Sequence, residues 1–140
     1  MPAITNMVNT ACSGVAFTSA PANGVDGVMP IGTTYTWAAP GITGGLTGGA
    51  AGTNAANISG SLTNPTNIPQ TATYTVTPKS GSCTGVPFTV AVTVDPKPAI
   101  TAMTAIICST GNFTLAPADG VNGIVPVSYT HPTLPTIYSV

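Results

Sequence analysis

The stretch TATYTVT at residues 71–77 decides the fold, and the stretch PFTVAVTV at residues 87–94 follows the same pattern. In the first stretch threonines alternate with apolar residues, and in the second Phe88 and three valines alternate with small or polar residues. Alternation with a period of two is typical of half-buried β-strands. Threonine is β-branched and carries a polar atom, so a threonine-rich face provides an uncharged exterior. We therefore expect two strands, each with one face toward a core.

Shorter strands are expected around these two. Residues 33–37, 15–18 and 58–62 are strand candidates, whereas the Gly/Ala/Thr-rich residues 41–56 are interpreted as a loose loop or an edge. No segment free of glycine and proline shows the apolar spacing of a helix, and turn signals are dense. About seven short strands in roughly 100 residues are typical of an immunoglobulin-like β-sandwich. The sequence therefore predicts an all-β sandwich.

The chain repeats itself at a fixed offset of 96 residues. Residues 2–30 match residues 98–126 without a gap, beginning with PAIT in both copies. A fixed period marks a tandem array of one folded unit. We expect residues 1–97 to form one complete module and residues 98–126 to form the N-terminal third of a second, truncated module.

Residues 127–140 do not continue the repeat. The stretch VSYTHPTLPT at residues 127–136 resembles, with one difference at Pro132, the translation of a transposon-based sequencing adapter. The alternative is a native strand, because residues 129–131 loosely match residues 35–37. We expect a non-native tail and exclude it from the fold.

The charge content is very low, because charged residues make up only 4% of the chain, against a usual share of about a quarter. Such a surface offers no electrostatic attraction to phosphate backbones, so we expect no nucleic-acid partner. No apolar run approaches the roughly 20 residues that span a bilayer, so we expect no membrane insertion. The residues before the tail lack His, Glu and Arg.

Catalysis requires a nucleophile with a base, paired carboxylates or a metal, and the sequence offers none of these before the tail. Asp26 and Asn23 of the first copy correspond to Asn122 and Asp119 of the second, so Asp and Asn exchange places. Turn positions tolerate this exchange because both side chains bond to nearby backbone. Weak calcium binding is the alternative. We predict no enzyme activity, no cofactor and no metal site.

The repeat also bears on the three cysteines. Cys12 and Cys108 occupy the same repeat position, and Cys83 falls in the last third of the first module. We predict a Cys12–Cys83 disulfide that stabilises the module by about 4 kcal/mol, with Cys108 left unpaired by truncation. Such bonds persist outside the cytoplasm. The alternative is two buried free thiols.

Taken together, five stretches resemble the PKD-like repeat of large secreted surface proteins of gliding Gram-negative bacteria. They are YTW at 35–37, ISGSLTN at 58–64, ATYTVTP at 72–78, SGSCTG at 80–85 and FTVAVTV at 88–94. The resemblance implies a β-sandwich exported to the cell surface, often by the type IX route. It also implies a stalk or adhesin role, with neighbouring repeats of the same chain as partners. The acidic Gly-Asp-Gly element of true PKD domains is missing after Trp37.

Two functions from different classes follow. The first is a non-catalytic structural and adhesive module that acts as a spacer in a tandem stalk at the bacterial cell surface. The second is a carbohydrate-binding module in which Tyr35, Trp37 and Tyr74 stack on sugars, with surface glycans or other cell-surface components as partners. We expect Trp37 and Tyr74, with Phe17 and Phe88, to be core residues instead.

Overall fold

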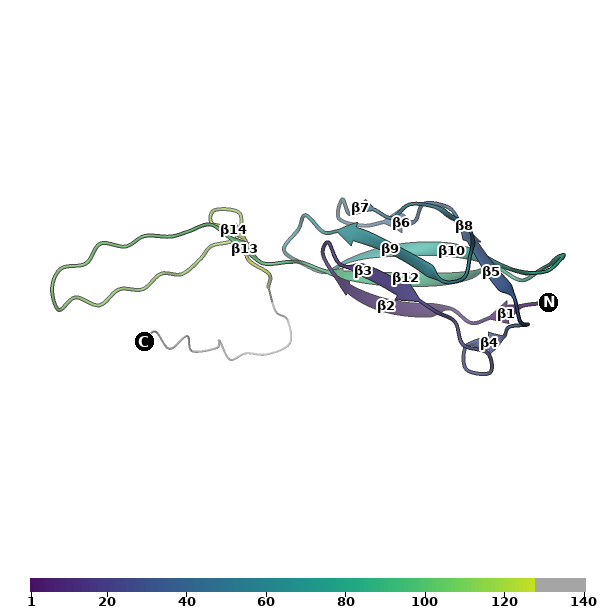
Figure 1. The fold of residues 1–140 in the computed structure, drawn as a ribbon. Helices are drawn as coiled ribbons and strands as arrows, with labels where there is room; N and C mark the ends of the chain where they lie inside the picture. The colour runs from purple at the N-terminus through teal and green to yellow at the C-terminus, as the bar shows by residue number, and fades with distance from the viewer. Residues whose placement is uncertain (128–140) are drawn as a thin grey trace.

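The fold is all-β in this computed structural model, which describes residues 1–127 and contains no helix within them (Figure 1). The strands are β1 (Ala3–Ile4), β2 (Met7–Cys12), β3 (Ala16–Ser19), β4 (Gly27–Val28), β5 (Thr33–Trp37), β6 (Gly41–Ile42), β7 (Thr47–Gly48), β8 (Gly52–Ala55), β9 (Ile58–Thr63), β10 (Gln70–Ser80), β11 (Cys83–Thr84), β12 (Phe88–Asp95), β13 (Ala99–Ile100) and β14 (Gly123–Ile124). Because no described residue is helical, the part of the chain that the structure describes contains no helix that could span a membrane.

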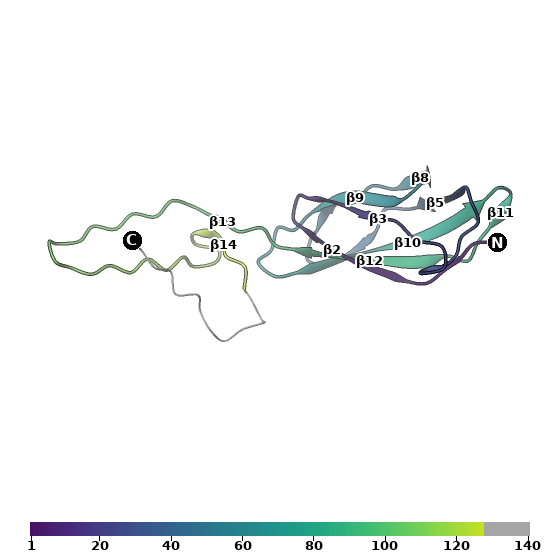
Figure 2. The same ribbon diagram turned by 60° about the horizontal axis from the view of Figure 1, so that its bottom comes forward.

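Two sheets face each other. The larger sheet has the order β2-β12-β10-β5-β8, and β6 and β11 also pair with β10. The smaller sheet has the order β3-β9-β7. Figures 1 and 2 show β3 and β9 lying over β12 and β10. This is the two-layer arrangement that buries the apolar faces of amphipathic sheets against each other.

The central strands β10 and β12 place their apolar residues inward, as the alternating sequence predicts. They run antiparallel, with Val76 opposite Phe88 and Gln70 opposite Val94. On β12 the phenylalanine and all three valines are buried, and the residues between them are half-buried. The buried apolar residues of the whole core are Phe17, Tyr35, Trp37, Leu46, Ile58, Leu62, Ala72, Tyr74, Val76, Phe88, Val90, Val92 and Val94.

Residues 41–56 form edges of the two sheets, which was one of the two interpretations of this stretch, and they also contribute to the core. Leu46 is buried in the core, and β8 pairs with β5 as an edge strand of the larger sheet. A Cβ on Gly52 would lie 2.3 Å from the Trp37 ring. Glycine at this position therefore lets the β8 backbone cover the tryptophan directly, which no side chain would permit.

Strand β2 is not among the strands that the sequence predicts. It pairs in parallel with β12, with Met7 opposite Val90 and Cys12 opposite Asp95. Its residues alternate between half-buried and exposed rather than between buried and exposed. A strand at a sheet edge buries little apolar surface, so its alternation is weak in the sequence.

The chain leaves the sandwich after β12 and continues as an extended segment (Figure 1). Within residues 98–127 the only paired strands are β13 and β14, and most other residues are exposed. The buried apolar core lies entirely between Phe17 and Val94. The complete sandwich is therefore built from the first copy of the repeat alone.

Candidate functional site

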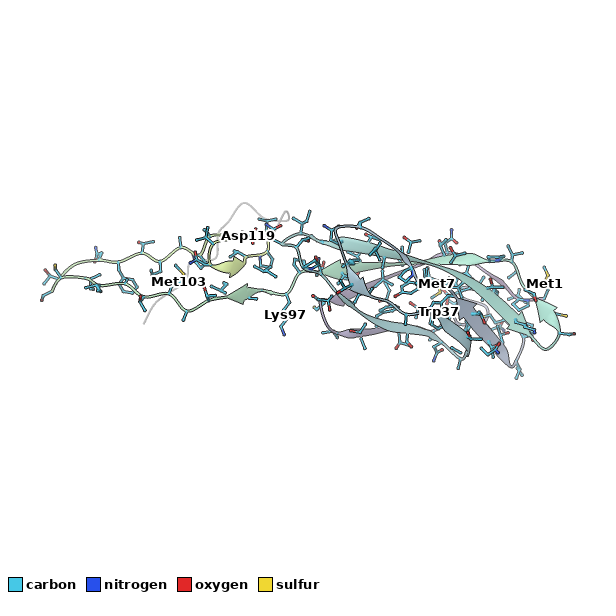
Figure 3. The ribbon with its side chains drawn as sticks, turned by 90° about the horizontal axis from the view of Figure 1, so that it is seen from above. Met1, Met7, Trp37, Lys97, Met103 and Asp119 are labelled. Carbon is cyan, nitrogen blue, oxygen red and sulfur yellow. The ribbon has the colours of Figure 1, made fainter. Side chains whose placement is uncertain are left out.

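The aromatic residues proposed as a sugar platform are buried. The exposed fractions of Tyr35, Trp37 and Tyr74 are 3%, 6% and 0%, and Figure 3 shows Trp37 inside the sandwich. The Trp37 indole nitrogen donates a hydrogen bond to the Ala50 carbonyl oxygen at 3.1 Å. A sugar stacks only on an exposed ring face, so a carbohydrate platform made of these residues is wrong for this fold.

Aromatic rings pack against one another inside the sandwich, and one pair, Phe17 on β3 and Tyr74 on β10, connects the two sheets. The Phe17 and Tyr74 rings pack with their centroids 5.6 Å apart, and the Tyr35 and Phe88 rings meet edge to face at 6.3 Å. Both arrangements are favourable for aromatic quadrupoles. All four expected core residues, including Trp37, are buried.

Burial also changes the acidity of two tyrosines. Burial raises the pKa of the Tyr74 hydroxyl above its ordinary value of 10.0, and this hydroxyl has no hydrogen-bond partner among residues 1–127. Burial, with a smaller contribution from the negative charge of Asp26, raises the pKa of Tyr35. The Tyr35 hydroxyl donates to the Met29 sulfur at 3.0 Å. Both tyrosines therefore hold their protons more tightly in the folded state than in the unfolded state.

We expect this difference to destabilise the module in alkali. Tyr35 and Tyr74 contribute stability fully below pH 10.0, and that contribution is lost as the pH rises through their higher folded pKa values. Urea unfolding at pH 8 and pH 11 should give a smaller free energy of unfolding at pH 11. Replacing both tyrosines with phenylalanine should reduce this drop. If the free energy of unfolding of the phenylalanine variant fell equally between pH 8 and pH 11, the two tyrosines would not be the cause of the alkaline destabilisation.

Asn23 and Asp119 hold equivalent turns. The Asn23 Oδ1 accepts a hydrogen bond from the Met29 amide at 2.8 Å, and the Asp119 Oδ1 accepts one from the Val125 amide at 2.9 Å. Met29 and Val125 are also equivalent in the repeat. Asn and Asp substitute for each other because the turn needs only a side-chain oxygen as acceptor.

Asp26 and Asn122 complete the same turns. The Asp26 Oδ2 accepts a hydrogen bond from the Ala22 amide at 2.8 Å, and the Asn122 Oδ1 accepts one from the Ala118 amide at 2.9 Å. These side chains therefore order backbone. Among residues 1–127, no group of three or more His, Cys, Asp or Glu side chains lies close enough to hold a metal ion.

The predicted Cys12–Cys83 disulfide is wrong for this fold. Cys12 lies opposite Asp95 and Cys83 lies opposite Ser80, at opposite ends of the larger sheet. The ten-residue step along β10 from Ser80 to Gln70 corresponds to about 33 Å, whereas a disulfide requires Cα atoms within about 7 Å. Cys12, Cys83 and Cys108 are free and exposed, so the alternative of buried thiols is also wrong. Loss of a partner by truncation therefore does not explain Cys108.

We expect the folded chain to carry three reactive thiols. Titration with a thiol reagent under native, non-reducing conditions should modify Cys12, Cys83 and Cys108. Because no cross-link within the chain constrains the unfolded state, a Cys12→Ser/Cys83→Ser variant should keep its free energy of unfolding within about 0.5 kcal/mol. If the double variant lost about 4 kcal/mol of unfolding free energy, or if only one thiol reacted, the Cys12–Cys83 disulfide would be present after all.

Asn64 is a structural residue that the sequence did not single out. It is 2% exposed, and its Nδ2 donates to the carbonyl oxygens of Ile68 and Val94, both at 2.8 Å. Its Oδ1 accepts from the Thr66 amide and hydroxyl, and its own amide donates to the Ser13 Oγ. Asn64 therefore joins the β9–β10 loop, the end of β12 and the turn after β2. The Asn64-Pro65 pair was the available signal, since Asn-Pro favours turns.

The fold and its buried residues define a class of protein. Two sheets built mostly of antiparallel strands enclose the β5 tryptophan. The Asp and Asn side chains of the two opening turns hydrogen-bond to backbone amides. This is an immunoglobulin-like β-sandwich module.

The comparisons identify the family. Residues 9–98 match the PKD-like domain family, and these residues are more than half of the chain. The chain therefore belongs to the PKD-like domain family. No curated protein and no solved structure matches the chain. Domains of this family are typically non-catalytic and occur in extracellular or surface proteins.

Proposed function

We propose that this chain is a non-catalytic structural and adhesive repeat module of a large secreted protein of the bacterial cell surface. Each module acts as a spacer in a tandem stalk. Its partners are neighbouring repeats and cell-surface components, and export follows the type IX route implied by the resemblance. In this proposal, residues 98–126 are the N-terminal third of a second module. Apart from Val127, the predicted non-native tail, residues 127–140, lies outside the described residues.

The observation that carries this proposal is a pair of strands that opens each copy of the repeat and has the same structure in both. Strand β1 pairs with β4 through Ala3 opposite Val28, and β13 pairs with β14 through Ala99 opposite Ile124. A Cβ on Gly27 or Gly123 would lie about 2 Å from the facing carbonyl oxygen, 2.1 Å and 1.9 Å respectively. The same glycine-dependent opening strand pair is therefore built twice in one chain.

The linker that follows the sandwich is suited to a spacer. Pro96 and Pro98 flank Lys97, and proline fixes φ and favours extended chain. The preceding Asp95 carbonyl oxygen accepts a hydrogen bond from the Ser13 amide at 2.9 Å. The chain therefore leaves the sandwich from a fixed position and continues through a stiff segment.

Small-angle scattering of arrays tests the spacer role. Proteins with one, two and four copies of residues 1–97 are suitable, because the core lies wholly within this segment. β10 has eleven residues, which corresponds to about 36 Å at 3.3 Å per residue. We expect the maximum dimension to grow linearly, by roughly this length per copy. Growth with the square root of copy number would indicate flexible links and contradict the spacer role.

A further inference from the structure

One residue of the sandwich contacts the second copy of the repeat. Asn67 lies in the loop between β9 and β10, and its Nδ2 donates a hydrogen bond to the Asp119 Oδ2. The Asn67 carbonyl oxygen also accepts a hydrogen bond from the Val127 amide at 3.2 Å, but Val127 is the first residue of the predicted tail and lies outside the second copy. Asp119 therefore uses one carboxylate oxygen for its own turn and the other for the preceding sandwich.

The loop that carries Asn67 is fixed to the end of the sandwich from which the chain leaves. Asn64 holds the Ile68 carbonyl oxygen within this loop and the Val94 carbonyl oxygen at the end of β12. Thr66 is hydrogen-bonded to Asn64 as well. The loop and the end of β12 are thus joined by hydrogen bonds, so a contact made by Asn67 ties the following segment to the end of the sandwich.

The first module carries the other half of such a contact at its opposite end. The opening strand pair β1–β4 lies at the N-terminal end of the sandwich, and the β9–β10 loop lies at the end from which the chain leaves (Figure 1). Asn23, the equivalent of Asp119, is exposed. Within residues 1–127 its Oδ1 holds the Met29 amide, and its Nδ2 has no hydrogen-bond partner.

We propose that the exposed face of the opening turn, residues 22–29, is a docking surface for the β9–β10 loop of another copy of this module. The proposal rests on the tandem function above and adds how consecutive copies are oriented. The residue at the Asn23 position determines which loop side chains dock.

The chemistry of this position gives a pairing rule. Asp119 offers only acceptor oxygens to a neighbour, so it requires a donor such as the Asn67 amide. Asn23 offers its Nδ2 as a donor, so it requires an acceptor. An asparagine at position 67 satisfies either partner by rotating its amide, whereas an aspartate at position 67 pairs with an asparagine turn and repels an aspartate turn.

Paramagnetic relaxation measures this docking in the full chain. The label is placed on Val121→Cys, which is exposed in the second turn, with the three native cysteines replaced by serine. We expect strong broadening of the amides of residues 64 and 66–68, since Pro65 has no amide proton. Because two carboxylates would face each other, Asn67→Asp should reduce the docked population about three- to tenfold. The compensating pair Asn67→Asp/Asp119→Asn should restore it.

Two further measurements make the test specific. The Val125 amide should stay protected from exchange in every variant, since either Asp or Asn at position 119 supplies its acceptor. In a tandem protein in which residues 2–97 follow residues 1–97 directly, which keeps the native spacing of 96 residues, the label is placed at Val25→Cys of the second copy. Asn67→Asp in the first copy should retain docking there, because the substituted loop meets Asn23.

Three results would overturn the proposal: no broadening in the unsubstituted labelled chain, no effect of Asn67→Asp, or no rescue by the compensating pair. If docking is absent but the maximum dimension of the arrays still grows linearly with copy number, the docking proposal is wrong and the spacer role stands. Non-linear growth with intact docking would instead contradict the spacer role and leave the contact in place.

Discussion

Replacing Trp37 with alanine should cost the module about 3–5 kcal/mol, the usual range when a buried aromatic side chain is truncated. The ring is 6% exposed and is covered by Gly52 and by the Ala50 carbonyl oxygen that accepts its indole hydrogen bond. Nothing small can refill this volume, because β8 lies directly on the ring. Since this is the only tryptophan, unfolding should be followed by circular dichroism in urea rather than by fluorescence.

Two control variants test whether the cost of Trp37→Ala comes from the burial of its ring. Val8→Ala removes an apolar side chain that is 86% exposed, and its cost should stay within about 0.5 kcal/mol. Trp37→Phe keeps an aromatic ring but loses the hydrogen bond, and it should fall between the control and the alanine variant. A Trp37→Ala cost below about 1 kcal/mol would contradict a core role and reopen the ring as a binding surface.

Asn64→Ala should cost about 2–4 kcal/mol, although it removes a polar residue. The substitution deletes side-chain hydrogen bonds to Thr66, Ile68 and Val94 and removes the Asn64 amide donor from the buried contact with the Val94 carbonyl oxygen. Leaving a buried polar group unsatisfied costs about 1–3 kcal/mol, in addition to the lost contacts. Chemical denaturation of the full chain measures the loss, and the exposed Asn57→Ala serves as its control.

A near-isosteric substitution sharpens this second prediction. Asn64→Asp keeps the acceptor for Thr66 but places a carboxylate against two carbonyl oxygens at neutral pH. We expect it to be at least as destabilising as alanine there, and to recover when acid protonates the carboxyl group. A stable Asn64→Asp variant at pH 7 would show that the donated hydrogen bonds do not hold this end of the module.

The strands in which apolar and polar residues alternate clearly were predictable from the sequence. Residues 33–37 form β5, and the stretches at 71–77 and 87–94 lie almost entirely within β10 and β12. Each alternates apolar and polar residues strongly because one face is fully buried. The all-β sandwich followed from such strands, and the family resemblance followed from five stretches taken together. Both are confirmed by the match over residues 9–98.

The strands that are defined by their contacts with other strands of the chain were not predictable from their own sequence. β2 is defined by its parallel register with β12, and β8 by a close approach to Trp37 that only glycine permits. The disulfide prediction failed for a related reason. The repeat showed that each module has two cysteine positions, but only the sheet register shows that Cys12 and Cys83 lie at opposite ends.

Asn64 and Asn67 show a second limit. Both lie in the short turn between β9 and β10 and are ordinary turn residues in sequence. One is buried and joins three segments, whereas the other contacts the following repeat. Which asparagine takes which role depends on where β2 and β12 end, and this is a property of the assembled sandwich.

Hydrogen exchange of the full chain, read by mass spectrometry, tests the central claim most directly. The claim is that residues 2–97 form a complete module, whereas residues 98–126 only begin a second one. We expect the slowest exchange in β10 and β12, whose inward residues are fully buried, because core strands open only with global unfolding. Residues 101–117 should exchange almost at once. Equal protection of both copies, or rapid exchange throughout β10 and β12, would contradict the account.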